Sequence, residues 1–355
     1  MIAFDRQTTA FQDFIGGMRQ QWANRLYPAL REEARERLAG RLPSTAEDVA
    51  EAVADSATYQ WFAWIERHFQ RMKYSDPRWG LVAAMYGRSE AVAEALAAAD
   101  DSRRLELDPA LAMPEYYAAV DIHQHPGNLT GAAFDGLVYQ LSATSIHPNT
   151  RRFEAHERFV DWLKPRGPFA RVLDMGCGFG KSTTPLARVF RDAEVIGIDI
   201  SEPCLRLAAV EADALQAENL RYAQRDLRAT GYADGSFDLV TSTQVLHELP
   251  LKDVERTLAE SFRLLRPGGL VVHLDFRAED PWAAFLIESH AGRNNEGYLP
   301  PFNRMDVRAA YERAGFEAVE IEPFAEREGA LAPDMPFWRF PWTLFAGRKP
   351  ATGRA

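Results

Sequence analysis

The spacing of apolar residues predicts helices over the first part of the chain. The capping-box pattern Ser-Thr-Ala-Glu at residues 44–47 is expected to open a helix that continues to about Tyr74. Within it Trp61, Ile65, His68 and Met72 recur at helical spacing and share one face, which Phe62 and Phe69 widen. A second, alanine-rich helix is expected from about residue 79 to residue 98. The aromatic face indicates helix packing in a core, and a dimer interface or a lid over a substrate are the alternatives.

After residue 168 short apolar runs alternate with helical segments, which is typical of a parallel sheet covered by helices on both faces. The expected strands lie at residues 171–175, 194–200, 221–225, 237–243, 270–276, 317–323 and 342–348. The chain is therefore predicted to have an α-helical N-terminal domain over residues 1–150, serving as a substrate cap, a dimerisation module or both. Residues 151–355 are predicted to form an α/β domain.

Composition narrows the class of protein. The chain has 355 residues, 46% of them hydrophobic, and a formal net charge of −10, which opposes binding to the phosphate backbone of nucleic acid. Only two cysteines are present, which suits a reducing compartment. No run of about 18 apolar residues occurs, so we expect a soluble, cytoplasmic protein without a membrane or nucleic-acid partner.

The first α/β strand ends in a glycine-rich turn, Asp-Met-Gly-Cys-Gly-Phe-Gly at residues 174–180. Glycines there let a ligand lie directly against the backbone. Lys181 stands where a dinucleotide-binding fingerprint has its third glycine, which favours a nucleoside without a pyrophosphate.

Acidic residues follow three successive strands: Asp174, Asp199 and Asp226. The carboxyl ends of parallel strands form the ligand crevice of an open α/β sheet, so these side chains are expected to converge. A carboxylate after the second strand suits ribose hydroxyls, and one after the third suits an exocyclic amine. The alternatives are that Asp199 only caps the next helix and that Asp226 is an exposed strand end.

An ordered set of five motifs resembles the class I S-adenosylmethionine-dependent methyltransferases. The motifs are Leu-Asp-Met-Gly-Cys-Gly-Phe-Gly at 173–180, Val-Ile-Gly-Ile-Asp-Ile-Ser at 195–201, Gln-Arg-Asp-Leu at 224–227, Ser-Phe-Asp-Leu-Val at 236–240 and Leu-Leu-Arg-Pro-Gly-Gly at 264–269. The resemblance covers roughly half the chain. It implies a Rossmann-like, seven-stranded, mostly parallel sheet whose last strand is antiparallel.

The resemblance also implies a cofactor site for S-adenosyl-L-methionine, released as S-adenosyl-L-homocysteine. The glycine loop would face the methionine part of the cofactor, Asp199 the ribose and Asp226 the adenine amine, with Ile200 and Leu227 against the ring. The full set assigned to the cofactor is Asp174, Gly176, Gly178, Gly180, Asp199, Ile200, Asp226, Leu227 and Gln244.

His247 and Glu248 follow the fourth strand, beside the expected crevice. An imidazole can take a proton from a hydroxyl at neutral pH. The position resembles the His-Asp pair of small-molecule O-methyltransferases, with Glu248 in place of Asp, so both residues are predicted to be catalytic. The alternative is that His247 hydrogen-bonds the start of the next helix or the cofactor carboxylate.

His123 and His125 form a second cluster, preceded by Tyr116 and Tyr117. In an extended segment the two histidines would point to the same side, as metal ligands do, with His147, His247 or His273 as further ligands. Two ligands do not make a site, so no metal is predicted. A role in the substrate pocket or in covering the cofactor is the preferred interpretation.

Residues 277–302 follow the fifth strand and carry aromatic and hydrogen-bonding side chains, among them Trp282 and Tyr298. We interpret this insert as a substrate lid, and an ordinary surface helix is the alternative.

These observations predict an enzyme that methylates a small organic molecule. An oxygen acceptor is preferred because of His247, while nitrogen, sulfur and carbon acceptors remain open. A homodimer through the N-terminal helices is a further expectation. The alternative functions are a non-catalytic cofactor-binding partner or regulator and an NAD-dependent oxidoreductase.

Overall fold

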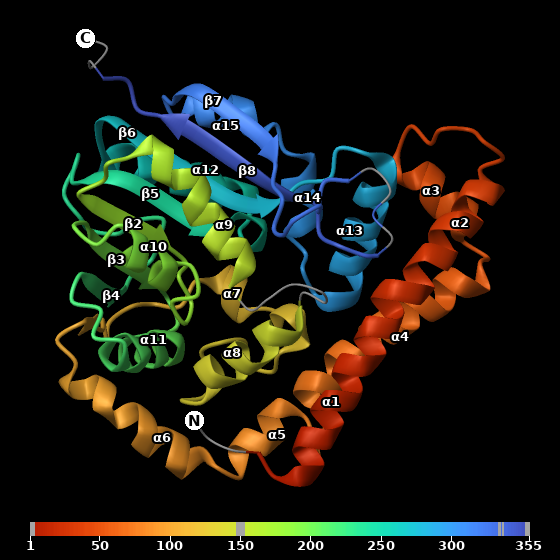
Figure 1. Ribbon diagram of the computed structural model, residues 1–355, viewed down its shortest axis with the longest axis horizontal. Coiled ribbons are helices and arrows are strands. Elements are labelled where there is room, and N and C mark those ends of the chain that lie inside the picture. Colours follow the sequence, from red (N-terminus) through yellow and green to blue (C-terminus); the bar gives the residue numbers. More distant parts are fainter. Residues whose placement is uncertain (1–3, 147–152, 333–334, 336, 352–355) are drawn as a thin grey trace.

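The computed structural model describes residues 4–146, 153–332, 335 and 337–351. An eight-stranded sheet forms its centre, in the order β1-β4-β3-β2-β5-β6-β8-β7 (Figure 1). The strands are β1 (Leu105–Glu106), β2 (Arg171–Met175), β3 (Glu194–Asp199), β4 (Leu220–Gln224), β5 (Phe237–Thr243), β6 (Leu265–Phe276), β7 (Glu317–Pro323) and β8 (Trp342–Arg348). Strand β8 runs antiparallel to both of its neighbours, and the other pairs are parallel. The predicted α/β fold is confirmed.

Two details of the sheet differ from the prediction. Strand β6 begins at Leu265, which pairs with Phe237, five residues before the predicted start. The eighth strand, β1, comes from the N-terminal region and pairs with β4 through Leu105–Tyr222 and Glu106–Ala223. A strand of two residues is too short to produce an alternating pattern, so the sequence could not reveal it.

Side chains of each strand alternate between two hydrophobic clusters on opposite faces of the sheet. On β2, Val172 joins the cluster that includes α9, α10 and α11, whereas Leu173 joins the one that includes α12 and α15. The helices of this half are α9 (Glu154–Leu163), α10 (Thr183–Val189), α11 (Glu202–Ala214), α12 (Leu251–Leu264), α13 (Pro281–Asn294), α14 (Leu299–Arg304) and α15 (Val307–Arg313). Burial on both faces explains why these strands read as nearly continuous apolar runs.

The N-terminal region is helical as expected. Its helices are α1 (Arg6–Gln21), continued by a π-helical turn (Trp22–Leu26), then α2 (Tyr27–Arg37), α3 (Ala46–Val53), α4 (Ala57–Ser75), α5 (Leu81–Tyr86), α6 (Ser89–Ala97), α7 (Glu115–Ala118) and α8 (Asp135–Ile146). Figure 1 shows α1 to α4 along one side of the molecule, with α13 between them and the sheet. The predicted boundary at residue 150 lies outside the described residues.

Both long helices predicted in this region are wrong in extent. Thr45 caps α3 in a capping box with Asp48, and the helix ends at Val53 because the chain turns before a new N-cap, Ser56, opens α4. The second predicted helix is likewise divided into α5 and α6.

The buried face of α4 also differs from the predicted one. Trp61, at the centre of the predicted face, has 59% of its surface exposed. Phe62 and Phe69, which were predicted to widen that face, are buried together with the polar residues Glu66 and Lys73. Burial of two ionisable side chains on a core-facing helix indicates a polar interior among the helices that pack against α4. Among the described residues, no helix combines the length and apolar character needed to cross a membrane.

Candidate active site

The glycine loop begins where β2 ends. Gly176 has φ 67°, and a Cβ there would lie 2.5 Å from Cγ2 of Val245, so a side chain would collide with the opposite wall. Asp174, just before the loop, lies outside the cavity that the loop borders. Its carboxylate accepts hydrogen bonds from the hydroxyls of Ser182 at 2.6 Å and Thr183 at 2.7 Å, and burial raises its pKa to about 6. Asp174 therefore connects the glycine loop to the start of α10 from outside the cavity.

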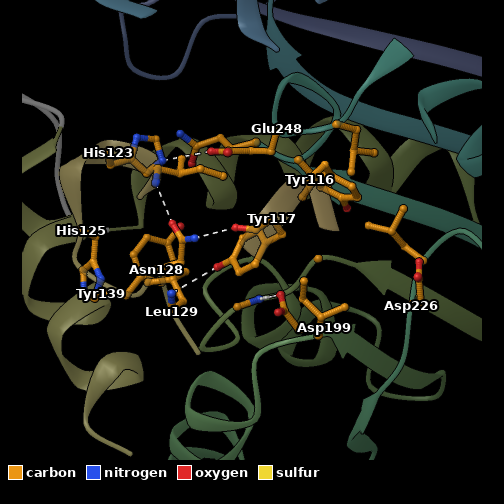
Figure 2. Close-up of a pocket in the computed structure, with 18 of the residues that line it drawn as sticks. Tyr116, Tyr117, His123, His125, Asn128, Leu129, Tyr139, Asp199, Asp226 and Glu248 are labelled. Carbon is orange, nitrogen blue, oxygen red and sulfur yellow. Dashed lines mark hydrogen bonds and ion pairs between the residues drawn. The ribbon is translucent and has the colours of Figure 1, made fainter. Parts of the chain in front are cut away.

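A cavity at the carboxyl ends of β2, β3 and β4 collects most of the residues predicted to bind the cofactor (Figure 2). Its lining includes Gly176, Gly178, Asp199, Ile200, Asp226, Leu227 and Gln244, together with Tyr116, Tyr117, His123, His125 and Glu248. Gly180 is absent from this lining, and a Cβ at its position would lie 2.3 Å from the hydroxyl of Tyr222.

The two carboxylates of this cavity have distinct partners. Asp199 accepts backbone hydrogen bonds from Gly178 and Ser201, both at 2.8 Å, and burial raises its pKa. Asp226 accepts from Nε of Arg228 at 3.0 Å, and Arg228 also contacts Asp253 at 3.2 Å. A carboxylate offers roughly four acceptor positions, so Asp199 retains capacity for a ligand, whereas the backbone amide and guanidinium of Arg228 make four hydrogen-bond contacts with Asp226.

A covering segment, residues 115–131, closes the cavity on the side opposite the sheet. Hydrogen bonds within the segment stabilise it. The side-chain amide of Asn128 donates to the carbonyl of Tyr117 at 2.7 Å, and the backbone amide of Leu129 donates to the Tyr117 hydroxyl at 3.2 Å (Figure 2). His123, Gln124 and Asn128 have φ between 55° and 58°, a region that residues other than glycine rarely adopt. Such strain persists only where surrounding contacts hold the backbone in place.

The extended segment in which His123 and His125 would point to the same side is not formed. Residues Ile122–Gln124 form a 3₁₀ turn, and the positive φ of His123 sends the two rings in different directions. His125 packs against Tyr74 with ring centroids 5.0 Å apart, and burial lowers its pKa to about 4. His273 is 2.6 Å from the hydroxyl of Ser242. His147 lies outside the described residues, and the described ones contain no group of three or more side chains arranged to hold a metal ion.

His247 is paired with Asp275, a residue that the sequence did not single out. Its Nδ1 lies 2.5 Å from Oδ1 of Asp275 at the end of β6, whereas Glu248 approaches Nε2 only to 3.5 Å. The expected partner was Glu248, so the pairing is corrected. Burial alone would lower the pKa of His247, but Asp275 and then Glu248 outweigh it and hold that pKa well above its usual value. The sequence does contain a signal for Asp275, because it is an isolated acidic residue in a largely apolar strand.

His247 belongs to a longer series that we call the imidazole–carboxylate chain: Asp275, His247, Glu248, His123, Glu296, His290 and Glu66. After the 3.5 Å step from His247 to Glu248, the successive nitrogen–oxygen distances are 3.0, 2.8, 3.0 and 2.8 Å. Glu66 also accepts from Nε of Arg293 at 2.6 Å. The series joins α4, the covering segment, the turn after β5 and the region around α13, which explains why no local pattern predicted it.

Carboxylates and imidazoles alternate along the imidazole–carboxylate chain, so each group lies next to groups of opposite charge. Burial opposes charge on each member, but the neighbouring carboxylates raise the pKa of His123 to about 10 and that of His290 to about 9. The histidines in turn lower the pKa of Glu248 to about 2, and Arg293 with His290 does the same for Glu66.

A second cavity adjoins the first and shares four residues with it: His123, Tyr139, Gln244 and Glu248. The rest of its lining comes from both halves of the chain: Arg19, Glu66, Phe69, Gln70, Ala143, Lys181, His247, Phe276, His290, Asn294, Glu296 and Phe340.

The two aromatic residues predicted as substrate contacts in the insert line neither of these cavities. The indole nitrogen of Trp282 is 3.3 Å from the hydroxyl of Tyr27. Tyr298 packs edge-on against Tyr116 with centroids 6.0 Å apart.

Comparison with known proteins agrees with the geometry. Residues 172–269 match the family described as "Methyltransferase domain". The chain is 33% identical over 207 residues to 27-O-demethylrifamycin SV methyltransferase of Amycolatopsis mediterranei, a match that covers 55% of this chain and 74% of that protein. The chain belongs to the class I S-adenosylmethionine-dependent methyltransferases.

Other relatives match over shorter lengths. Trans-aconitate 2-methyltransferase of Deinococcus radiodurans is 41% identical over 117 residues, which cover 33% of this chain and 42% of that protein. The chain thus spans less than half of that relative. Among solved structures, phosphoethanolamine N-methyltransferase 2 of Haemonchus contortus in complex with S-adenosyl-L-methionine aligns with 18% identity and a TM-score of 0.49, covering 67% of this chain and 61% of that one.

The first cavity fits the cofactor of this methyltransferase class. It combines a glycine cradle that a Cβ would fill, the carboxylate of Asp199 with spare acceptor capacity, and apolar walls from Ile200 and Leu227. That donor set suits an adenosine with free ribose hydroxyls. In Figure 2, Asp199 and Asp226 lie toward the sheet side of the cavity, across from His123 and Glu248.

Proposed function

We propose that this methyltransferase transfers a methyl group to the hydroxyl oxygen of a small organic molecule bound in the second cavity. The observation that carries the proposal is the His247–Asp275 pair, whose imidazole lines that cavity beside the residues shared with the first. A carboxylate that accepts the Nδ1 proton leaves Nε2 as the atom that can take a proton from an acceptor.

The cofactor, when bound, supplies a methyl group already activated by the positive charge on sulfur. Asp199 would hold the ribose hydroxyls, Asp226 the adenine amine, and the loop at Gly176 and Gly178 the methionine part. Alignment of the reacting groups is worth about 7–11 kcal/mol of the barrier. Proton removal by His247 adds on the order of 10²–10⁴-fold. Glu248 would stabilise the imidazolium that results.

The domain roles are part of the proposal. Residues 151–355 would form the methyltransferase domain, and residues 1–150 a cap that completes the acceptor site. Arg19 and Phe69 from this cap line the second cavity. The insert at 277–302 would act as a lid, because His290 and Glu296 come from it. His123 lines both cavities, while Tyr116, Tyr117 and His125 line only the first, so these three would contact the cofactor side.

We also propose a homodimer through the N-terminal helices. Trp61, Trp64 and Phe14 are 59%, 52% and 57% exposed, and large exposed aromatic side chains favour association. Light scattering of the wild type and of a Trp61→Ser, Trp64→Ser double variant tests this. A monomeric wild type would exclude the dimer.

The function is tested in two steps. Calorimetry should detect binding of S-adenosyl-L-homocysteine but not of NAD. A panel of phenols, alcohols, amines and thiols is then incubated with S-adenosyl-L-methionine, and methylated products are identified by mass spectrometry. Methyl ethers are expected. Products methylated only on nitrogen or sulfur would exclude the oxygen preference, and cofactor binding without any product would favour a non-catalytic binding protein.

A further inference from the structure

We propose that the hydroxyl of Tyr139 binds the carboxylate on the methionine part of the cofactor, so that a helix of the N-terminal region completes the donor site. Tyr139 lies on α8, outside residues 172–269, which match the methyltransferase family. This inference rests on the cofactor placement given under the proposed function and adds a binding residue to it. It depends on the position of Tyr139, on its unused hydroxyl and on the donors that the glycine loop has already engaged.

Tyr139 stands against the glycine loop. A Cβ placed on Gly178 would lie 3.2 Å from Cε1 of Tyr139, and the tyrosine ring packs edge-on against Phe179 with centroids 5.2 Å apart. Figure 2 shows Tyr139 and Asp226 on opposite sides of the first cavity, with Asp199 between them. A ligand whose adenine lies at Asp226 and whose ribose lies at Asp199 therefore extends its amino acid part toward Tyr139.

Packing of α8 fixes the place of this tyrosine. Gly136, three residues earlier on the same face of the helix, approaches α11 so closely that a Cβ there would lie 2.4 Å from the carbonyl oxygen of Pro203. The tyrosine side chain that follows on this face lines both cavities. A group held in this way by a packed helix is suited to orient a ligand, because the helix does not have to move when the ligand binds.

The protein does not use the hydroxyl of Tyr139. The hydroxyl makes no hydrogen bond with any described residue, and its oxygen is not among the fully buried polar atoms without a partner. Burial raises the pKa of Tyr139, so the hydroxyl keeps its proton at neutral pH and can donate it. Because a largely buried tyrosine usually finds a hydrogen-bond partner, this donor is available to a ligand in the cavity.

The glycine loop has few donors left for an anion. The amide of Gly178 donates to Asp199 at 2.8 Å. The amides of Cys177 and Gly180 donate to the carbonyls of Ile198 and Cys177 at 3.0 and 2.9 Å. In loops that bind anions through the backbone, such amides point at the ligand instead. A carboxylate lying against this loop therefore needs a donor from a side chain, and Tyr139 supplies one.

Three ligands separate the charged groups of the methionine part. S-adenosyl-L-homocysteine carries an ammonium and a carboxylate, its decarboxylated analogue keeps only the ammonium, and methylthioadenosine lacks both. Calorimetry on the full chain, without an acceptor, measures the affinity for each. The wild type should bind S-adenosyl-L-homocysteine about 10- to 100-fold more tightly than the decarboxylated analogue, as expected for a hydrogen bond to a charged group.

Variants assign this carboxylate preference to the hydroxyl. Tyr139→Phe keeps the ring against Gly178 but removes the donor, so the preference should fall by about 10-fold or more. The affinity ratio between the decarboxylated analogue and methylthioadenosine should not change. Tyr86→Phe, at an exposed position of α5 that lines neither cavity, should keep the wild-type preference. The Tm of unliganded Tyr139→Phe should equal that of the wild type, because no hydrogen bond to a described residue is lost.

The inference is overturned if the wild type binds S-adenosyl-L-homocysteine and the decarboxylated analogue equally well, or if Tyr139→Phe keeps the preference. A Tyr139→Phe protein that does not fold would overturn it too, since the hydroxyl would then have a structural partner. Analysis of the methylated products separates these outcomes from failure of the proposed function. Methyl ethers formed without a carboxylate preference would exclude only the role of Tyr139. A preference that is lost in Tyr139→Phe, without any methyl ether, would exclude only the oxygen acceptor.

Discussion

Nδ1 of His247 lies 2.5 Å from Oδ1 of Asp275, and the other oxygen of that carboxylate accepts the backbone amide of Leu246 at 2.8 Å. The carboxylate is fully buried, so the backbone of the turn after β5 and the imidazole are held by the same group. This geometry gives His247 one orientation and one available nitrogen.

Replacing His247 with alanine should lower kcat by about 10²–10⁴-fold, the range for loss of a general base. The affinity for S-adenosyl-L-homocysteine should not change, because His247 does not line the first cavity. Steady-state kinetics and calorimetry measure the two effects. His68→Ala, at a partly exposed position of α4, is the matched control. Full turnover in the His247 variant would show that His247 does not act as a general base.

The pH profile should report the raised pKa of His247. Only the neutral imidazole can accept a proton, so kcat/KM should fall as pH drops below that pKa. Since Asp275 and Glu248 hold it above 6.5, the acidic limb should also lie above 6.5. Asp275→Asn should move the acidic limb of kcat/KM to lower pH and reduce the maximum value of kcat/KM. Glu248→Gln should move the acidic limb to lower pH by a smaller amount. A wild-type limb at or below 6.5 would contradict this assignment.

Asp199→Ala should weaken S-adenosyl-L-homocysteine binding by about 10- to 100-fold, because hydrogen bonds to a charged group are lost. Some of the effect will come through Gly178, whose amide donates to Asp199. Calorimetry on this variant and on Asp192→Asn, an exposed control, measures it. Equal affinity in wild type and Asp199→Ala would mean that Asp199 serves only to hold the backbone at Gly178 and Ser201.

The contacts of His123 should make stability depend on pH. Its pKa is about 10 in the folded protein and about 6.5 when unfolded, so its stabilising contribution is complete below 6.5 and disappears as pH rises through 10. The Tm difference between wild type and His123→Gln should therefore shrink from pH 6.5 to pH 10. Thermal unfolding at several pH values measures this, and a constant difference would contradict it.

Lys73→Met should raise the Tm. Lys73 is 1% exposed, its ammonium has no hydrogen-bond partner among the described residues, and burial lowers its pKa well below the usual value. Removing a buried amine that has no hydrogen-bond partner among the described residues relieves a desolvation cost, and a methionine fills a similar volume. Differential scanning calorimetry should show a higher Tm than in the wild type, whereas Arg71→Met should be neutral. A lower Tm would indicate a binding partner for the ammonium.

The parts of the site that sequence could predict are those carried by local motifs. Gly176, Asp199 and Asp226 follow strands with strong apolar patterns, so their convergence followed from the parallel sheet. Asp275 and Glu296 could not be assigned in this way, because their partners are distant in sequence. The contact of His123 with Glu248 could not be predicted either, because it depends on a turn in which His123 has a positive φ.

The break between α3 and α4 illustrates a similar limit. Apolar spacing continues through residues 54–56, and only the capping geometry of Ser56 marks a new start. A serine inside an apolar pattern has several conformations available, and tertiary packing selects among them.

Strand β1 has a consequence for dissecting the protein. By pairing with Tyr222 and Ala223, Leu105 and Glu106 cover the outer edge of β4, which would otherwise present unpaired amides and carbonyls. A fragment beginning at residue 151 would expose that edge and invite pairing with other copies. Solubility of the catalytic half should therefore depend on retaining residues near 105, although none of them contacts the cofactor cavity.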